Sequence, residues 1–223
     1  MKKHYFLCEL CLNFLVFFAW ILPSLLFRDT SGRIFTEWHF PLSNLTFLIA
    51  AVLVCAVELK NNGRNLKFER HQASAKNILT ALITLCALFA LSFISQSAAS
   101  FSGFTAENTA IRKPGNLQEM IFCLLTFFSA ALFEELVFRF YEPFSLKKLL
   151  SFVPEFYAAL LSELIPAALF ALCHRYLGLF AVSNAFFAHF ALRFCFKKTG
   201  NIFYPFASHF AYNLLSLYTM LMF

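Results

Sequence analysis

Three short runs of the chain place acidic, basic, imidazole and amide side chains inside otherwise apolar sequence. The first run, SAALFEELVFRFYEPF, carries Glu134, Glu135 and Arg139. Glu135 and Arg139 are four residues apart, so on a helix they stack on one face with the glutamate N-terminal, the better orientation for an ion pair. Glu134 points about 100° away from that pair. The spacing therefore indicates one glutamate held by the arginine and a second one free to exchange protons with a water.

The other two runs each pair residues that share a helix face. In FALCHRY, Phe170 and His174 are four residues apart, and in ASHFAYN the same spacing joins His209 and Asn213. An imidazole and an amide side by side are two donors suited to the oxygen that becomes negative during acyl transfer. Each pair also has a plain structural explanation, because polar side chains join helices to one another in membranes.

Charged groups inside a membrane need a reason to be there. Each one costs roughly 2.5–3.5 kcal/mol at the bilayer centre, so Glu134, Glu135 and Arg139 must be paired or functional. A buried packing network of all three is the alternative to a catalytic site. Outside the three runs, Glu163 and His189 are also intramembrane candidates, and a hydrogen-bonded core histidine is the simpler interpretation of His189.

The composition predicts the elements that must position these residues. The chain has 223 residues, of which 60% are hydrophobic, 33 are phenylalanine and only 13% are charged. Such a balance excludes an ordinary soluble domain and predicts an all-α, polytopic transmembrane helical bundle, because the chain lacks the alternating pattern of a barrel. About seven apolar runs are long enough to cross the bilayer, with the candidate site in the last four. These runs are 5–27, 41–58, 77–96, 117–140, 155–173, 177–196 and 202–223.

The net charge of +6 predicts an orientation rather than a nucleic-acid partner, because the basic residues sit in short loops and form no continuous face. The lipid bilayer is the expected surrounding. With the N-terminus inside, eleven basic residues lie on the inner side and five on the outer side, which predicts a cytoplasmic N-terminus and an external C-terminus. The inner set is Lys2, Lys3, Lys60, Arg64, Lys67, Arg70, Lys76, Lys147, Lys148, Lys197 and Lys198, and the outer set is Arg28, Arg33, Arg112, Lys113 and Arg175.

Taken in order, the motifs EExxxR (134–139), FxxxH (170–174) and HxxxN (209–213) resemble those of the CPBP intramembrane proteases. This family includes the type II CAAX prenyl endopeptidases and the bacterial Abi proteins that process bacteriocins or confer immunity to them. The run KKTGNIFYPFASHFAYN is similar to the family's approach to its last motif, a turn at 199–201 before the histidine helix. Phe140 departs from the family, in which many members have glycine after the arginine.

The resemblance implies an endopeptidase in which a glutamate and a histidine activate a water and a second histidine with an asparagine stabilises the oxyanion. The substrate would be a peptide or membrane protein: a prenylated CAAX protein, a leader peptide or another membrane protein. The location would be a bacterial inner membrane. The implied catalytic residues are Glu134, His174, His209 and Asn213, and the implied structural supports of the site are Glu135, Arg139 and Phe170.

A metal-dependent version of the same site is the main alternative within the family. Glu134, His174 and His209 could form a three-ligand zinc set with an open position. The absence of an HExxH pattern favours the glutamate and water mechanism, which requires no cofactor.

The resemblance covers the second half of the chain, which we interpret as a catalytic helical core at 117–223 after N-terminal spans and loops at 1–116, in one structural domain. If Glu134 and His174 face one another on antiparallel helices, the turn between them should lie near residue 154, a proline. The helix of Glu134 should then continue past Arg139, with a kink at Pro143. Two other function classes fit the same residues: a non-catalytic scaffold or immunity protein, and a proton-coupled transporter with a Glu-His relay.

Overall fold

A computed structural model describes residues 3–26, 37–62, 74–103 and 113–222, and the described chain consists of helices joined by short turns, without a strand. The successive helices join into long segments that follow the predicted apolar runs. The elements are α1 (Lys3–Val16), η1 (Phe17–Ile21), α2 (Leu22–Leu26), α3 (His39–Asn62), α4 (Ala75–Phe101), α5 (Leu117–Glu134), η2 (Glu135–Tyr141), α6 (Glu142–Leu149), α7 (Glu155–Cys173), η3 (Arg175–Leu177), α8 (Leu179–Thr199) and α9 (Phe203–Met222).

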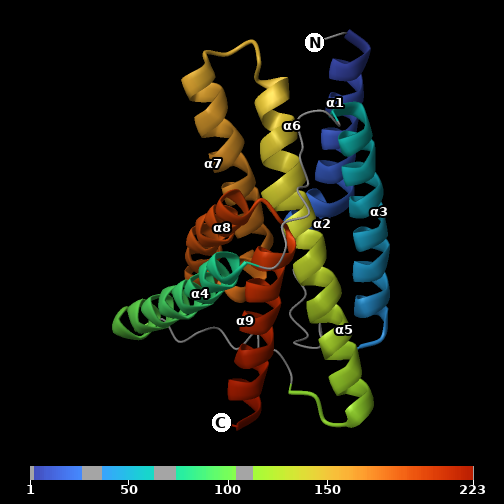
Figure 1. Ribbon diagram of the computed structural model, residues 1–223. Helices are drawn as coiled ribbons and strands as arrows, with labels where there is room; N and C mark the ends of the chain where they lie inside the picture. Colours follow the sequence, from blue (N-terminus) through green and yellow to red (C-terminus); the bar gives the residue numbers. More distant parts are fainter. Residues whose placement is uncertain (1–2, 27–36, 63–73, 104–112, 223) are drawn as a thin grey trace.

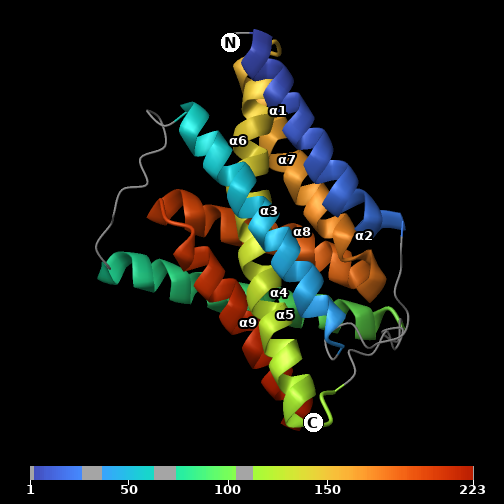
Figure 2. The same cartoon turned by 90° about the vertical axis from the view of Figure 1, so that its right-hand side faces the viewer.

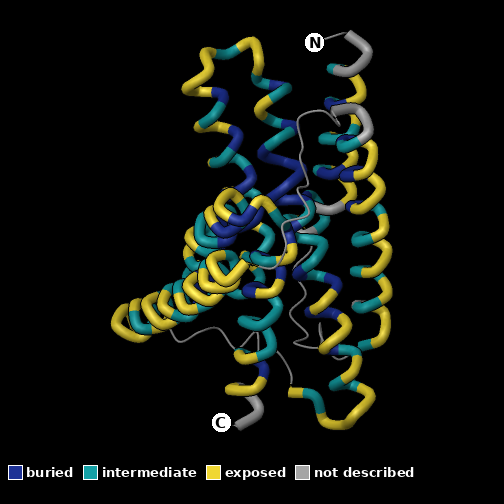
Figure 3. Tube along the Cα trace, viewed as in Figure 1, coloured by how far each residue is buried: buried dark blue, intermediate teal, exposed yellow. Residues whose placement is uncertain are grey.

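Five helical segments of the described chain are long and apolar enough to cross a membrane, and Phe6–Ala19 forms a shorter apolar helix. The five are Pro41–Leu59, Ala75–Phe101, Leu117–Leu149, Glu155–Cys173 and Leu179–Thr199. Large apolar side chains such as Leu79, Phe93 and Phe187 are more than half exposed, as expected where lipid replaces water. Exposed positions recur along the helices of the bundle (Figure 3). The predicted all-α, multi-pass membrane fold is confirmed, and the seven predicted spans agree roughly with these helices.

The segment α5–η2–α6 is the central rod of the bundle (Figures 1 and 2). α3 packs along α5 and η2, α7 packs against α6 and α8, and α9 packs against α4 and α5. The start of α1, the end of α3 and the α6–α7 turn lie at one end of the bundle, whereas the C-terminus and the start of α5 lie at the other (Figure 1). Of the predicted sidedness residues, Lys2, Arg28, Arg33, Arg64, Lys67, Arg70 and Arg112 lie outside the described residues.

Local interactions explain where the rod begins, where its helix type changes and where it ends. Asn116 caps α5 by accepting from the Glu119 amide at 2.9 Å, and Glu119 accepts from the Gly115 amide in return. The rod continues past Arg139 as predicted, but its irregularity is the π-helical segment η2, which precedes Pro143. π segments inside α-helices occur frequently at functional sites. The rod ends at Leu149, and Pro154 precedes α7, which confirms the predicted turn.

Candidate active site

The centre of the site is an ion pair on η2 with no exposed surface. Glu135 and Arg139 are both fully buried, with 3.5 Å between Glu135 Oε2 and Arg139 Nε. The Arg139 guanidinium also lies 3.9 Å from the centroid of the Phe170 ring and donates from Nη1 to the Glu134 carbonyl at 3.4 Å. A buried charge must be compensated, and here a carboxylate, an aromatic face and a backbone oxygen share that task. The predicted pairing of Glu135 with Arg139 is present.

His209 on α9 lies between the two adjacent glutamates. Its Nδ1 is 2.9 Å from Glu135 Oε1, and its Nε2 is 3.8 Å from Glu134 Oε2. Glu135 therefore orients the imidazole ring and directs Nε2 toward Glu134. The two consecutive glutamates have separate partners. Glu135 contacts Arg139 and His209 Nδ1, whereas Glu134 lies on the Nε2 side of the His209 ring.

The turn before α9 sets the position of His209. Gly200 adopts a left-handed conformation with φ 64°, which closes α8 and suits glycine. The Thr199 hydroxyl donates to the Cys195 carbonyl at 2.8 Å, and Asn201 Oδ1 accepts from the Phe203 amide at 2.9 Å, which starts α9. The turn predicted at 199–201 is confirmed.

His174 ends α7 and has a defined tautomer. Its Nδ1 lies 2.8 Å from the Phe170 carbonyl oxygen, which can only accept, so Nδ1 carries the proton. Nε2 is then the nitrogen with a free lone pair. The Phe170 ring lies 4.7 Å from the imidazole, centroid to centroid, and fixes its tilt. His174 is thus arranged to accept a proton, or a hydrogen bond from water, through Nε2.

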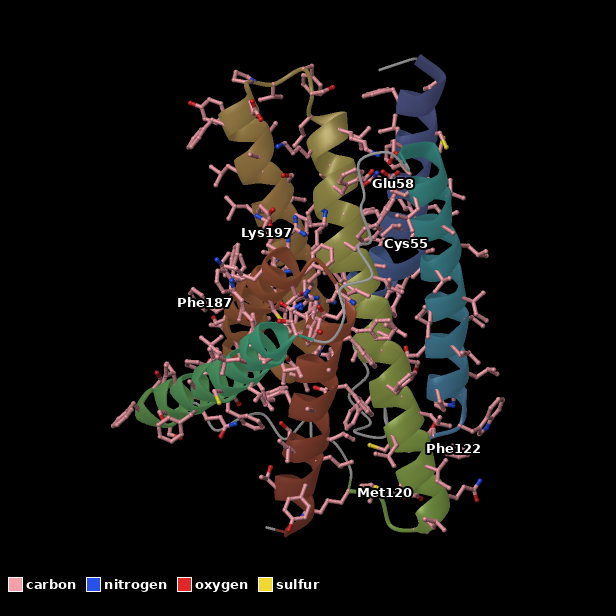
Figure 4. The ribbon with its side chains drawn as sticks, viewed as in Figure 1. Cys55, Glu58, Met120, Phe122, Phe187 and Lys197 are labelled. Atoms are coloured by element: carbon pink, nitrogen blue, oxygen red, sulfur yellow. The ribbon has the colours of Figure 1, made fainter. Side chains whose placement is uncertain are left out.

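A cavity of about 270 Å³ brings the predicted catalytic residues together. Walls from α4, α5, α7, η3, α8 and α9 enclose it, and in Figure 4 nitrogen and oxygen atoms gather where α8 and α9 meet the central rod. Of the residues singled out from the motifs, Glu134, Phe170, His174, His209 and Asn213 line the cavity. Glu135 and Arg139 lie behind this wall.

The cavity also has polar lining residues that the three motifs did not indicate: Tyr176, Asn184, Tyr212 and Ser216. Asn184 lies in an apolar run and fits none of the three motifs. A polar residue inside a membrane segment is nevertheless a sequence signal of a functional site. Desolvation by the surrounding side chains, with the Glu134 carboxylate adding to it, raises the pKa of Tyr176. Its hydroxyl therefore stays protonated well above neutral pH and remains a donor.

Glu163 and His189, which belong to no motif, have different surroundings. Glu163 on α7 accepts from Arg193 Nε and Nη2, each at 2.9 Å, and from Lys197 at 2.8 Å. Arg193 also donates from Nη1 to the Arg139 carbonyl at 2.5 Å, so Glu163 acts on the site through Arg193. His189 is fully buried, as expected of a core histidine. Neither of its ring nitrogens has a hydrogen-bond partner among the described residues, so the predicted hydrogen bond is wrong.

The donor set does not fit a metal ion in this arrangement. Within the described chain, no group of three His, Cys, Asp or Glu side chains is placed to hold one. His209 offers Nδ1 to Glu135, and its Nε2 lies against Glu134.

Comparison with known proteins supports the resemblance found in the motifs. A family model described as type II CAAX prenyl endopeptidase Rce1-like matches residues 116–215, which contain all three motifs, so the predicted recognition is confirmed over that region. Comparisons with curated proteins and with solved structures gave no significant match. Together with the five apolar helices, this match makes the chain an integral, multi-pass membrane protein whose residues 116–215 are similar to that family.

Proposed function

Because residues 116–215 belong to the Rce1-like family of type II CAAX prenyl endopeptidases, we propose that the protein is an intramembrane endopeptidase that uses a glutamate-activated water. One observation carries the proposal: four side chains of complementary chemistry line a single cavity of about 270 Å³ inside the bundle. These are Glu134, His174, His209 and Asn213.

In the proposed reaction, a water held between Glu134 and His174 Nε2 loses a proton to Glu134 as its oxygen attacks the scissile carbonyl carbon. The carbonyl oxygen becomes negative and accepts from His209 Nε2 and the Asn213 amide. Since Nδ1 of His209 donates to Glu135, Nε2 carries a proton only in the charged ring, and the two glutamates on either side balance that charge. The carbon–nitrogen bond then breaks, and the proton on Glu134 passes to the leaving amine.

The substrate is a peptide or a membrane protein whose scissile bond reaches membrane depth. A prenylated CAAX protein, a leader peptide and another membrane protein are the candidate classes. We also propose a cytoplasmic N-terminus, which follows from the distribution of the basic residues, and a bacterial inner membrane as the location. A protease-sensitive tag fused to the N-terminus should then survive external protease in spheroplasts, whose inner membrane is intact.

The test is cleavage of a membrane-peptide library in liposomes, with new peptide termini read by mass spectrometry. Glu134→Gln removes the group that takes the proton but keeps its size, so cleavage should fall at least about 100-fold. Glu155→Gln is the matched control, because the Glu155 side chain is 88% exposed at the start of α7. This variant should cleave the peptides at the wild-type rate.

Two outcomes would favour other functions. Equal product patterns from the wild type and Glu134→Gln, or no products from either, would support a scaffold or immunity role. Proton-coupled flux across the liposome membrane, lost in Glu134→Gln without any cleavage, would support a transporter.

A further inference from the structure

We infer that Asn184 binds the backbone of the substrate, and that the end of the cavity around it takes an uncharged, apolar substrate side chain. This inference rests on the proposed peptidase function. It begins with one atom: Asn184 Oδ1 is buried and accepts no hydrogen bond within the described part of the chain. Asn184 nevertheless lines the cavity that also contains Glu134 and His209.

Asn184 reaches the cavity from a wall that carries none of the motif residues. The residues of α8 that line the cavity recur three and four positions apart, so they form one face of the helix. They are Ala181, Asn184, Ala185, Ala188 and Leu192. Glu134, His209 and Asn213 come from α5 and α9, whereas His174 ends α7, ten residues before Asn184. A peptide that offers its carbonyl to the motif residues therefore has its neighbouring backbone against α8.

A buried acceptor without a donor costs free energy, about 1–3 kcal/mol in proteins, so its retention needs an explanation. An extended peptide supplies the matching donor, because each backbone N–H that enters an apolar site must find an acceptor. A side-chain amide also carries two N–H donors and can pair with the adjacent backbone carbonyl. Asn184 thus has the chemistry to hold one peptide unit of an extended substrate.

Apolar residues of α4, α5 and α8 define the substrate side chain. Leu88, Phe127, Ala130 and Leu192 line the cavity as well, and they offer no partner to a charged group. Burial of a charge there would be strongly unfavourable. A volume of about 270 Å³ lies below the roughly 300–1,000 Å³ of pockets for drug-sized ligands, so it holds one or two residues with the water. The alanines of α8 leave the space for an aliphatic or aromatic side chain.

The first experiment uses the best-cleaved library peptide and a series of its analogues, each N-methylated at one backbone nitrogen. Asn184→Ala should raise KM about 3- to 10-fold, the effect of one neutral hydrogen bond, and leave kcat within about twofold. For the wild type, one N-methyl position should cause a similar loss. For Asn184→Ala that same analogue should cause no further loss, because the acceptor is already gone. Ser183→Ala, one residue along α8 and exposed, is the matched control and should behave like the wild type.

The second experiment fills the cavity. Ala188→Leu should shift preference at one substrate position from leucine or phenylalanine toward alanine by about 10-fold or more, because added methylenes remove space. Ser183→Leu adds the same side chain to the exposed face of α8 and should leave the preference unchanged.

The outcomes separate this inference from the proposed function. If the wild type cleaves and Glu134→Gln does not, but Asn184→Ala shows the wild-type KM and the wild-type response to every N-methyl analogue, then Asn184 does not bind the backbone and the inference fails alone. Binding of the uncleaved peptide to Glu134→Gln, compared with the Glu134→Gln Asn184→Ala double variant, measures the same contact without turnover. If no peptide is cleaved by the wild type, the proposed function fails first.

Discussion

Phe170 serves two residues of the site at once. Its ring lies beneath the Arg139 guanidinium at 3.9 Å, and its backbone carbonyl accepts from His174 Nδ1 at 2.8 Å. The side chain therefore stabilises a buried charge while the main chain fixes the tautomer of a histidine. The FxxxH motif thus acts through an aromatic face and a carbonyl oxygen, and only the first of these depends on the residue being phenylalanine.

Phe170→Leu should separate these two contributions. The carbonyl remains, but the aromatic face under Arg139 is lost, so we expect a loss of about 1–3 kcal/mol in the free energy of unfolding and slower cleavage per folded molecule. Thermal unfolding in detergent and the cleavage rate measure the two effects. Phe140→Leu removes a ring of the same size, which packs edge to face against Phe196. This control should lower stability but spare the cleavage rate, and an equal loss of rate in both variants would contradict the role given to the ring.

The proposed water activation requires no metal ion, which is testable at the same scale. Treatment with 1,10-phenanthroline should leave the cleavage rate within about twofold of the untreated value, since side chains supply the base and the oxyanion donors. A zinc peptidase assayed alongside should lose its activity. Inhibition that added zinc reverses would instead support the three-ligand set of Glu134, His174 and His209.

At the scale of the element, the π segment η2 needs support from its neighbours. Pro143 has no N–H to donate to the Arg139 carbonyl four residues earlier. Arg193 from α8 donates to that carbonyl at 2.5 Å and is itself held by Glu163 on α7. Arg193 therefore connects α7 to a backbone oxygen of η2, and we expect the position of Glu134 and Glu135 to depend on that contact.

Arg193→Met should slow cleavage about 10-fold or more, because it removes a charged donor from a carbonyl next to the site. Lys197→Met is the matched control: it removes another partner of Glu163 at 2.8 Å but leaves the contact with Arg139 intact. We expect Lys197→Met to stay within about twofold of the wild-type rate. Equal losses would mean that charge near Glu163, rather than support of η2, matters.

At the scale of the whole molecule, a polar cluster ties the N-terminal helices to the central rod. Lys148 on α6 contacts Glu9 of α1 at 3.1 Å and also pairs with Glu58 of α3, which Figure 4 labels. Ser145 donates to Glu9 at 2.6 Å and accepts from Asn13 at the same distance. The first helices are thus held to the site-bearing rod by charge as well as by apolar packing.

Lys148→Met should lower the free energy of unfolding by about 3–5 kcal/mol, because it leaves two buried carboxylates without their shared ammonium. Lys147→Met provides the comparison, since Lys147 is 54% exposed and its pair with Glu155 spans 3.7 Å at the surface. Such a pair contributes about 0–1 kcal/mol. Thermal unfolding of both variants in the same detergent measures the difference, and equal shifts would show that the cluster does not join the helices.

The sequence by itself determined the class of fold and the local pairings within the candidate site. Apolar length dictated the helices because a backbone in lipid must satisfy its own hydrogen bonds, and the spacings of four placed Glu135 with Arg139 and Phe170 with His174. The midpoint between Glu134 and His174 also located the turn at Pro154 correctly. These features depend on residues close together in the chain, which helix geometry relates directly.

Only the tertiary structure decided which residues on different helices contact one another. It put His209 between Glu134 and Glu135 and joined Glu163 to the Arg139 carbonyl through Arg193. It also turned Asn184 toward the cavity of the motif residues and left His189 buried without a hydrogen-bond partner among the described residues. A helix pattern gives the face of each residue but not the partner helix, its register or its depth, because those follow from packing among all the helices together.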